Sequence, residues 1–190
     1  MEKIFDLALL FMAVTLLVKH RLFHYLRFLQ QEDYAIDRFR EWNKKNRAFD
    51  KKGTSLFLSS IPFAFLLNPT LVLLALLGGV HWITKQEKDP RSHGKLRLQM
   101  TARAKRIYRT AFALYLGVAL FLMGVISLYD FYVLNALSAI LLIQLTPLWL
   151  VGAVFFLRRG EERLQEQYVR EAKNVFNKIS PFTIGITGSY

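Results

Sequence analysis

The chain has 190 residues, no cysteine, 53% hydrophobic residues and a formal net charge of +12. The absence of cysteine excludes disulfides, thiolate metal sites and cysteine nucleophiles. Apolar and charged residues lie in different segments: residues 53–84 carry no charge, and residues 110–157 carry only Asp130. Uncharged stretches of this length are typical of membrane spans. The sequence therefore predicts an integral membrane protein with an all-α, polytopic fold of four to five hydrophobic segments.

The first apolar segment, residues 4–18, resembles a signal peptide only in its hydrophobicity. Asp6 lies within it, and the bulky basic run Lys19-His20-Arg21 follows it without a small-residue cleavage site. We expect the segment to be retained. If it crosses the bilayer, the chain has five crossings, and if it only enters the interface, the chain has four.

The next segment is basic, with ten Lys/Arg against five Asp/Glu in residues 19–52. Its apolar residues recur at helical spacing, which predicts an interfacial helix over residues 19–50 on an anionic membrane surface. The residues expected to contact the lipid surface, here and in the second basic segment, are Lys19, Arg21, Arg27, Arg38, Arg40, Trp42, Arg103, Lys105 and Arg106.

Two further basic segments follow, with nine Lys/Arg against two acids in residues 85–109 and six against four in residues 158–178. The positive-inside rule places all three basic segments in the cytoplasm, so an even number of crossings separates the first two. Asn68-Pro69 is a turn signal between them. We predict a helical hairpin over residues 54–67 and 70–84, re-entrant or thinning the bilayer, because each arm rises only ~22 Å. The alternative is one long helix kinked at Pro69.

Beyond the second basic segment, residues 107–126 form a full-length span and residues 136–157 return, with a bend expected at Pro147. Together these segments make a membrane domain over residues 1–159. Residues 160–180 predict a cytoplasmic, amphipathic linker helix. Small residues in the spans suit close helix packing within or between chains, which makes a homo-oligomer possible: Gly78, Gly79, Gly117, Gly124 and Gly152.

Residues 182–187 have the composition of a buried strand, with a β-branched run from Thr183 to Thr187, and Gly188-Ser189-Tyr190 follow. A strand that leads into a glycine turn is how a phosphate-binding loop begins. The Gly-Lys-Thr/Ser that would complete such a loop is not present. Thr187, Gly188, Ser189 and Tyr190 are therefore candidates for part of a nucleotide-binding loop only.

These last residues carry a family resemblance. "YVREAKNVFNKISPFTIGITGSY" is similar to the junction that leads into the ATP-binding domain of Mur ligases, especially the muramoyl-tripeptide D-alanyl-D-alanine ligases, and "FLQQEDYAIDRFREW" and "MTARAKR" are similar to the membrane-spanning extension of some bacterial members. The resemblance implies that residues 181–190 begin an α/β ligase domain of a longer protein. It further implies ATP and Mg²⁺ for the intact protein, and peptidoglycan precursor synthesis at the bacterial inner membrane. We expect no catalytic residue and no cofactor in the 190 residues themselves, which should not hydrolyse ATP.

Other clusters favour structural roles. His20 and His24 stand at i and i+4 on one helix face, but no third ligand is evident, so we expect no metal site. Four carboxylates lie among basic residues at salt-bridging spacing, which favours a solvated face over acid–base chemistry: Glu32, Asp33, Asp37 and Glu41. The basic segments adjoin hydrophobic spans, so membrane lipid is a simpler counterion than nucleic acid.

Three functional hypotheses follow from the sequence. The first is a membrane anchor that places a cytoplasmic Mur-ligase-like enzyme near lipid-linked peptidoglycan precursors or the enzymes that make them. The alternative is a stand-alone membrane scaffold or lipid-binding protein that assembles with a partner. The third is a small transporter or membrane enzyme with a cavity between the hairpin and the last spans, which the dearth of intramembrane charge disfavours.

Overall fold

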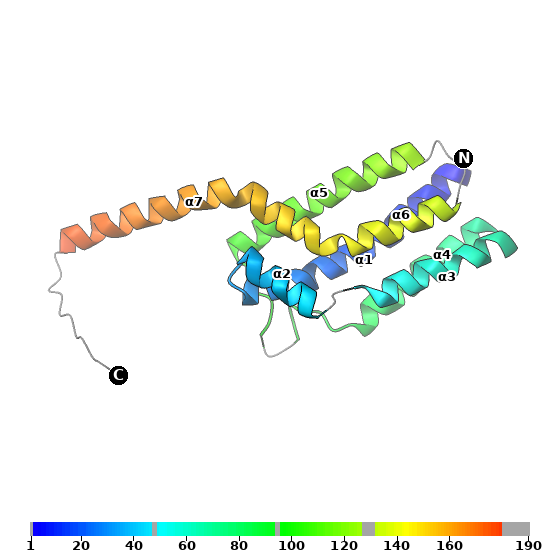
Figure 1. Ribbon diagram of the computed structural model, residues 1–190, viewed down its shortest axis with the longest axis horizontal. Helices are drawn as coiled ribbons and strands as arrows, with labels where there is room; N and C mark the ends of the chain where they lie inside the picture. The colour runs from blue at the N-terminus through cyan, green and yellow to red at the C-terminus, as the bar shows by residue number, and fades with distance from the viewer. Residues whose placement is uncertain (1, 47–48, 94–95, 127–131, 180–190) are drawn as a thin grey trace. The chain divides into compact units, whose positions relative to one another are not determined.

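The computed structural model describes residues 2–46, 49–93, 96–126 and 132–179, and this part of the chain is helical without a strand (Figure 1). The chain divides into two compact units, a bundle (Met1–Val154) and a C-terminal unit (Phe155–Tyr190). The helices are α1 (Glu2–Gln31), α2 (Ile36–Lys45), α3 (Lys51–Leu66), α4 (Pro69–Gln86), α5 (Ala102–Ile126), α6 (Tyr132–Gln144) and α7 (Thr146–Ile179). The predicted all-α class is confirmed for the described residues.

Helix α1 joins two segments that the sequence analysis separated. Residues 4–18 and the start of the expected interfacial helix form one continuous helix of 30 residues. The apolar residues Leu22, Leu26 and Leu29 are fully buried within the protein, so the apolar face of this part of α1 is covered by other helices. The prediction of a single interfacial helix over residues 19–50 is wrong, because the chain turns after Gln31 and resumes as the short helix α2.

The turn after α1 uses the left-handed backbone region at two residues that are not glycine, Asp33 (φ 52°) and Tyr34 (φ 61°). The N–H of Tyr34 returns to the carbonyl of Leu29 at 2.8 Å, which satisfies a carbonyl at the end of the helix. The Gln30 side chain also holds the loop before α5: its Nε2 donates to the carbonyl of Gln99, and its Oε1 accepts from the Gln99 N–H, both at 2.9 Å.

The core of the bundle forms around α1, which packs against α4, α5 and α6 (Figure 1). On α5 the buried residues follow a helical period and most are small, so that helix can approach α1 closely. Tyr115 is the large exception, and its hydroxyl pairs with the Thr15 hydroxyl at 2.9 Å. The buried residues of α5 are Ala104, Ile107, Ala111, Tyr115 and Ala119.

Helices α3 and α4 pack against each other as a hairpin, which is the arrangement expected from the charge distribution rather than one long kinked helix. The turn forms because Asn68 caps α4: its Oδ1 accepts from the Thr70 N–H at 2.9 Å, and Pro69 occupies the first helical turn, where a missing N–H costs nothing. A Cβ on Gly79 would lie 2.8 Å from Leu56, so this glycine permits the two arms to approach. Gly78 and Gly117 have open space beside them instead.

Helices α6 and α7 are separated at Leu145 and bent by 54°. Pro147 has no N–H and cannot continue the helix from α6, so the Ile143 carbonyl accepts the Thr146 hydroxyl at 2.5 Å instead. The expected bend at Pro147 is therefore present. The expected single helix over residues 136–157 is wrong, since the break lies inside it.

In the C-terminal unit, α7 continues through Gly160 to Ile179 without the predicted boundary at 160. One glycine costs a helix only ~1 kcal/mol, and one i,i+4 ion pair spans this position while a second lies beyond it. The pairs are Arg158 with Glu162 at 2.9 Å and Arg170 with Glu166 at 3.3 Å.

One helix is long and apolar enough to cross a membrane, Ala102–Val125. The bent pair α6 and α7 counts as a second candidate if the two are taken as one broken span. The remaining described helices do not meet this test.

Candidate functional site: an ion cluster at the charged end of the bundle

A group of polar side chains meets where α1 passes the start of α3 and the ends of α4 and α6. Helices α1, α4 and α6 run toward this end of the bundle and α3 starts from it, while the tip of the α3–α4 hairpin lies at the opposite end (Figure 1). We call this group the ion cluster, and its members are His20, Arg21, His24, Asp50, Lys52, Glu87 and Gln144.

Asp50 is the most buried carboxylate of the cluster, with a side chain only 4% exposed. It caps α3 by accepting from the Gly53 N–H at 2.9 Å. Arg21 donates to both of its oxygens, from Nε at 2.5 Å and from Nη2 at 3.1 Å. The Gln144 side chain then holds the Asp50 backbone, accepting from its N–H and donating to its carbonyl, both at 3.2 Å. Asp50 thus ties α1, α3 and α6 together.

Glu87 is the second carboxylate, and it stands at the C-cap of α4. A helix C-terminus carries partial negative charge, so a carboxylate there requires cations. Arg21 donates to its Oε2 through Nη1, and Lys52 lies 3.3 Å from its Oε1. His20 Nε2 also lies 3.0 Å from Oε2. Glu87 therefore joins α1, α3 and α4 at a single side chain.

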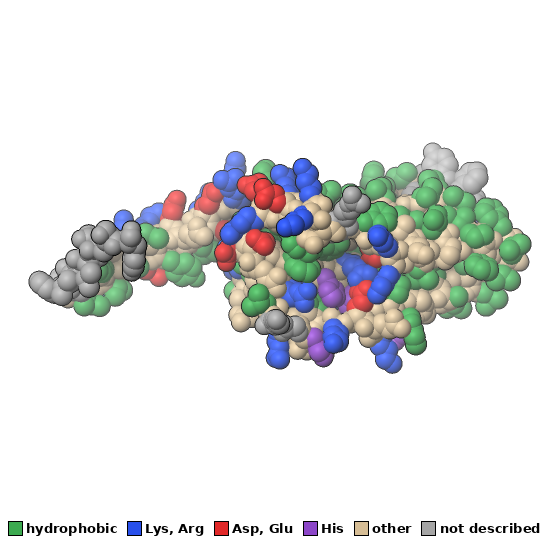
Figure 2. Space-filling view, turned by 60° about the horizontal axis from the view of Figure 1, so that its bottom comes forward, with side chains coloured by type: hydrophobic (Ala, Val, Ile, Leu, Met, Phe, Trp, Pro, Cys, Tyr) green, Lys and Arg blue, Asp and Glu red, His purple; other side chains and the backbone are tan. Residues whose placement is uncertain are grey.

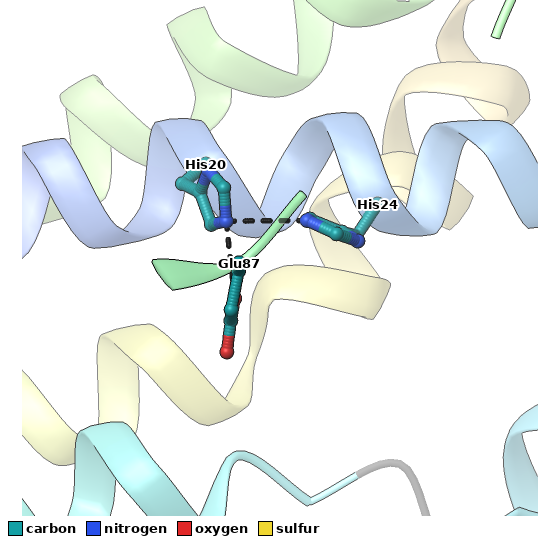
Figure 3. A group of neighbouring side chains, drawn as sticks. All are labelled: His20, His24 and Glu87. Carbon is teal, nitrogen blue, oxygen red and sulfur yellow. Dashed lines mark hydrogen bonds and ion pairs between the residues drawn. The ribbon is translucent and has the colours of Figure 1, made fainter. Parts of the chain in front are cut away.

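The two histidines of α1 complete the cluster (Figure 3). His20 Nε2 lies between the Glu87 carboxylate and His24 Nε2, and the two ring nitrogens are 3.1 Å apart. Among the described residues, His20, His24 and Glu87 are the group whose potential metal-ligand atoms all lie within 4.8 Å of one another. His20 and Glu87 also line a pocket of about 230 Å³, together with Asp89.

Burial and the neighbouring charges shift the pKa values of three members of the ion cluster. Burial, followed by the neighbouring His20 ring, lowers the pKa of His24 to about 4, so His24 is neutral near pH 7. Burial alone would raise the pKa of Glu87, but hydrogen bonds from His20, Arg21 and Lys52 outweigh it and hold this pKa well below its usual range. Burial also disfavours the Arg21 charge, yet the hydrogen bonds and charges of Asp50 and Glu87 raise the pKa of Arg21.

The chain matches no family model, no curated protein and no solved structure. The resemblance to the membrane extension of Mur ligases therefore stays a hypothesis that rests on the quoted motifs.

The residues expected to contact lipid divide into three groups: exposed residues, the ion-paired Arg21, and partly buried residues. Lys19, Arg38, Arg40 and Lys105 are exposed. Arg21 is not placed for the lipid surface: its side chain is 12% exposed and its guanidinium is directed at two carboxylates, which is a correction to the sequence analysis.

The remaining residues expected to contact lipid are partly buried, and three of them contact aromatic rings. Arg27 lies over the Phe28 ring at 4.8 Å, and Trp42 stacks on the same ring at 4.0 Å. Arg103 lies over the Tyr34 ring at 4.4 Å. Arg106 is partly buried as well. These contacts combine a cationic head with an apolar body at one surface.

The acidic group on the turn after α1 forms the charge-laced surface that the spacing indicates. Arg38 lies 3.4 Å from Asp33 and 3.9 Å from Glu32. The predicted strand over residues 182–187 and the partial nucleotide loop, Thr187, Gly188, Ser189 and Tyr190, lie outside the described residues.

Sequence reasoning missed Asp50 and Glu87 as members of a site. A signal for Glu87 was present, because the segment of residues 85–109 contains only two acids, Glu87 and Asp89, among nine basic residues. An acid in such surroundings, next to the end of a hydrophobic helix, is a candidate partner for a cation on a neighbouring helix. No local spacing links it to Arg21, which is 66 residues away.

The opposite end of the bundle carries a smaller polar contact. The Thr70 hydroxyl donates to Asp6 Oδ1 at 2.6 Å, beside a pocket of about 280 Å³ whose lining includes Lys3, Tyr132 and Asn135. This pocket lies between α1, α4 and α6. It is the nearest counterpart to the cavity that the transporter hypothesis requires, and it contains one carboxylate.

Proposed function

We propose that the bundle is a multi-pass domain of the bacterial inner membrane, and that it anchors a cytoplasmic enzyme domain carried further along the chain. The observation that supports this is the separation of its surface: large apolar side chains cover the end that contains the hairpin tip, whereas Lys, Arg and His gather toward the ion cluster (Figure 2). The tip exposes Phe63, Phe65, Leu66, Leu67 and Leu71, each between 53% and 77%.

Exposing this apolar surface to water would be unfavourable in free energy. Contiguous exposed apolar patches on soluble proteins mark contact with a partner or a membrane. In the bundle the exposed apolar residues extend from the tip onto α5 and α6, where they include Leu120, Phe121 and Leu137. Lipid is the simplest partner that covers several helices at once, and α5 has the length and hydropathy to cross it alone.

The hairpin fits this arrangement as a re-entrant element. Helices α3 and α4 have 16 and 18 residues, which corresponds to ~24 and ~27 Å at 1.5 Å per residue, less than a ~30 Å hydrocarbon core. A tip that ended in water would favour polar residues, but this tip carries phenylalanine and leucine. We therefore infer that it ends within the bilayer.

The orientation is tested by accessibility of single cysteines, which the native chain lacks. Lys88→Cys and Lys105→Cys should react with a membrane-impermeant maleimide only after cells are permeabilised. Val125→Cys, at the end of α5, should react in intact cells. Phe65→Cys should resist the reagent in both conditions. Reaction of Lys88→Cys in intact cells, or of Phe65→Cys at the rate of Lys105→Cys, would contradict the proposal.

The nature of the anchored enzyme rests on the family resemblance alone. We propose an ATP-dependent, Mur-ligase-like amide ligase that uses Mg²⁺ and acts on peptidoglycan precursors near the membrane. The test is the reading frame beyond codon 190: Gly-Lys-Thr/Ser should follow Tyr190 directly and supply the cationic and magnesium-binding side chains of the loop. A different continuation would end this part of the proposal and leave the membrane domain unaffected.

A further inference from the structure

We propose that His20, His24 and Glu87 bind one divalent transition-metal ion of the zinc type, with a fourth coordination position open to the pocket beside them. This site is independent of the anchoring function. It lies at the charged end of the bundle, outside the apolar segments.

Two of the three distances between the ligand atoms match those around a tetrahedral ion, and the three atoms all lie within 4.8 Å of one another. Ligand atoms that each lie ~2.0–2.1 Å from such an ion are about 3.3 Å apart. His20 Nε2 is 3.1 Å from His24 Nε2 and 3.0 Å from Glu87 Oε2. The spacing of i and i+4 on α1 places both rings on one face, and the end of α4 brings the carboxylate to them (Figure 3).

A single proton serves the three facing atoms of the group less fully than a metal ion would. Nε2 of a neutral imidazole holds either one proton or one lone pair. To donate to Glu87, His20 must carry its proton on Nε2, and that nitrogen then has no lone pair for His24. To accept from His24, the same nitrogen must lose the proton, and it then opposes a carboxylate oxygen. Without a metal, one Nε2–H of His20 is shared between Glu87 and the lone pair of His24, whereas all three atoms can present lone pairs to a metal ion.

The surroundings also suit a cation. The C-terminus of α4 directs partial negative charge to this place. Asp50 and Glu87 match the charges of Arg21 and Lys52, and Arg27 adds one further positive charge near His24. Arg21 and Lys52 hydrogen-bond Glu87, and such outer contacts orient a ligating carboxylate.

The donor set indicates the class of metal. Two imidazoles and one carboxylate suit zinc, cobalt or nickel, whereas calcium and magnesium prefer oxygen ligands only. Three protein ligands beside an open position are typical of zinc sites that bind water or a small ligand. The pocket of about 230 Å³ has His20 and Glu87 in its wall and provides room for it.

The test is metal binding by the purified 190-residue chain in detergent, prepared with an affinity tag that contains no histidine. After treatment with a chelator, the protein is titrated with Zn²⁺ by calorimetry and with Co²⁺ by visible absorption. We expect one ion per chain and the intense absorption bands of tetrahedral cobalt. A chain that binds no ion, or that shows only the weak bands of hydrated cobalt, would overturn the proposal.

The matched variants locate the site. His20→Gln, His24→Gln and Glu87→Gln should each weaken Zn²⁺ binding at least tenfold, whereas His81→Gln and His93→Gln, at exposed positions, should bind like the parent. The helical circular dichroism of each variant identifies any that has not folded, and the readout then rests on the folded variants among the three. Unchanged affinity in a folded His24→Gln variant, or equal loss in His81→Gln, would show the metal to be bound elsewhere and the proposal to be wrong.

Discussion

Two helices of the bundle, at its opposite ends, are capped at their N-termini by different side chains. Asp50 caps α3 at the charged end, and Asn68 caps α4 at the hairpin tip. Both side chains accept a backbone N–H at 2.9 Å. Asp50 is nevertheless charged, buried and paired with Arg21, whereas Asn68 is neutral, exposed and surrounded by apolar side chains.

The difference indicates where each end of the bundle lies. A carboxylate is a good cap where a guanidinium neutralises it, and the arginine is held by two carboxylates in turn. An amide is the better cap among exposed apolar side chains, since it carries no charge that would have to be neutralised there. In our proposal both ends require a side chain that accepts a backbone N–H. Asp suits the aqueous end and Asn suits the end within the bilayer.

The largest expected effect comes from removing the cation of the charged end. Arg21→Met keeps the apolar part of the side chain but leaves Asp50 and Glu87 without their shared partner. We expect a loss of about 3–5 kcal/mol in the free energy of unfolding, because a buried carboxylate remains uncompensated. Denaturation in detergent, followed by circular dichroism, measures it.

The control for this change is Arg38→Met, which removes an exposed ion pair and should cost less than about 1 kcal/mol. The double variant Arg21→Met/Asp50→Asn should recover part of the loss, since Asn still caps α3 and carries no charge. Equal costs for the two single variants would mean that the ion cluster contributes no more than a surface pair.

An intermediate effect is expected at the tip. Asn68→Asp changes only the charge of the cap, and in water Asp and Asn cap a helix about equally. If the tip lies in lipid, the change should cost about 2–3 kcal/mol in bicelles, the scale of placing an aspartate within a bilayer. Asn68→Ser, a neutral cap, should cost only a few tenths of a kcal/mol. Equal stability of the Asp and Ser variants would place the tip in water.

The smallest effect compares two glycines. A Cβ at Gly53, next to the Asp50 cap, would lie 2.7 Å from Leu17 Cδ2, and Leu17 is fully buried. Gly53→Ala should therefore cost about 1–2 kcal/mol. Gly78→Ala, with open space around it, should be neutral or stabilising by up to about 1 kcal/mol, because alanine favours the helix. The same denaturation experiment compares them, and a stabilising Gly53→Ala would contradict the close approach of α1 and α3.

The elements that sequence reasoning predicted well have local causes. The hairpin follows from Asn68-Pro69 and from the charge on its two flanks, and the break before α7 follows from Pro147. The burial of Leu22, Leu26 and Leu29 against other helices, rather than against lipid, was not predictable in the same way. Helical periodicity identifies an apolar face, but protein and lipid cover such a face equally well.

The candidate site was predictable only in part. The spacing of His20 and His24 identifies two possible ligands, but Glu87 reaches them through the packing of α4 on α1. Arg21 was assigned to lipid because its sequence neighbours are basic, and the structure supplies carboxylates from segments 29 and 66 residues away. Long-range pairs of this kind depend on helix packing, which no single segment encodes.

Two glutamines hold single backbone residues that precede helices, Gln99 before α5 and Asp50 before α3. Gln30 and Gln144 each pair with both the N–H and the carbonyl of one backbone residue, Gln99 and Asp50 respectively. A primary amide reproduces the donor and acceptor of a peptide unit, so each side chain acts as a one-residue β-bridge. Glutamate lacks the donor and lysine lacks the acceptor, so neither can take over this role, and the junctions ahead of α3 and α5 depend on the amide group itself.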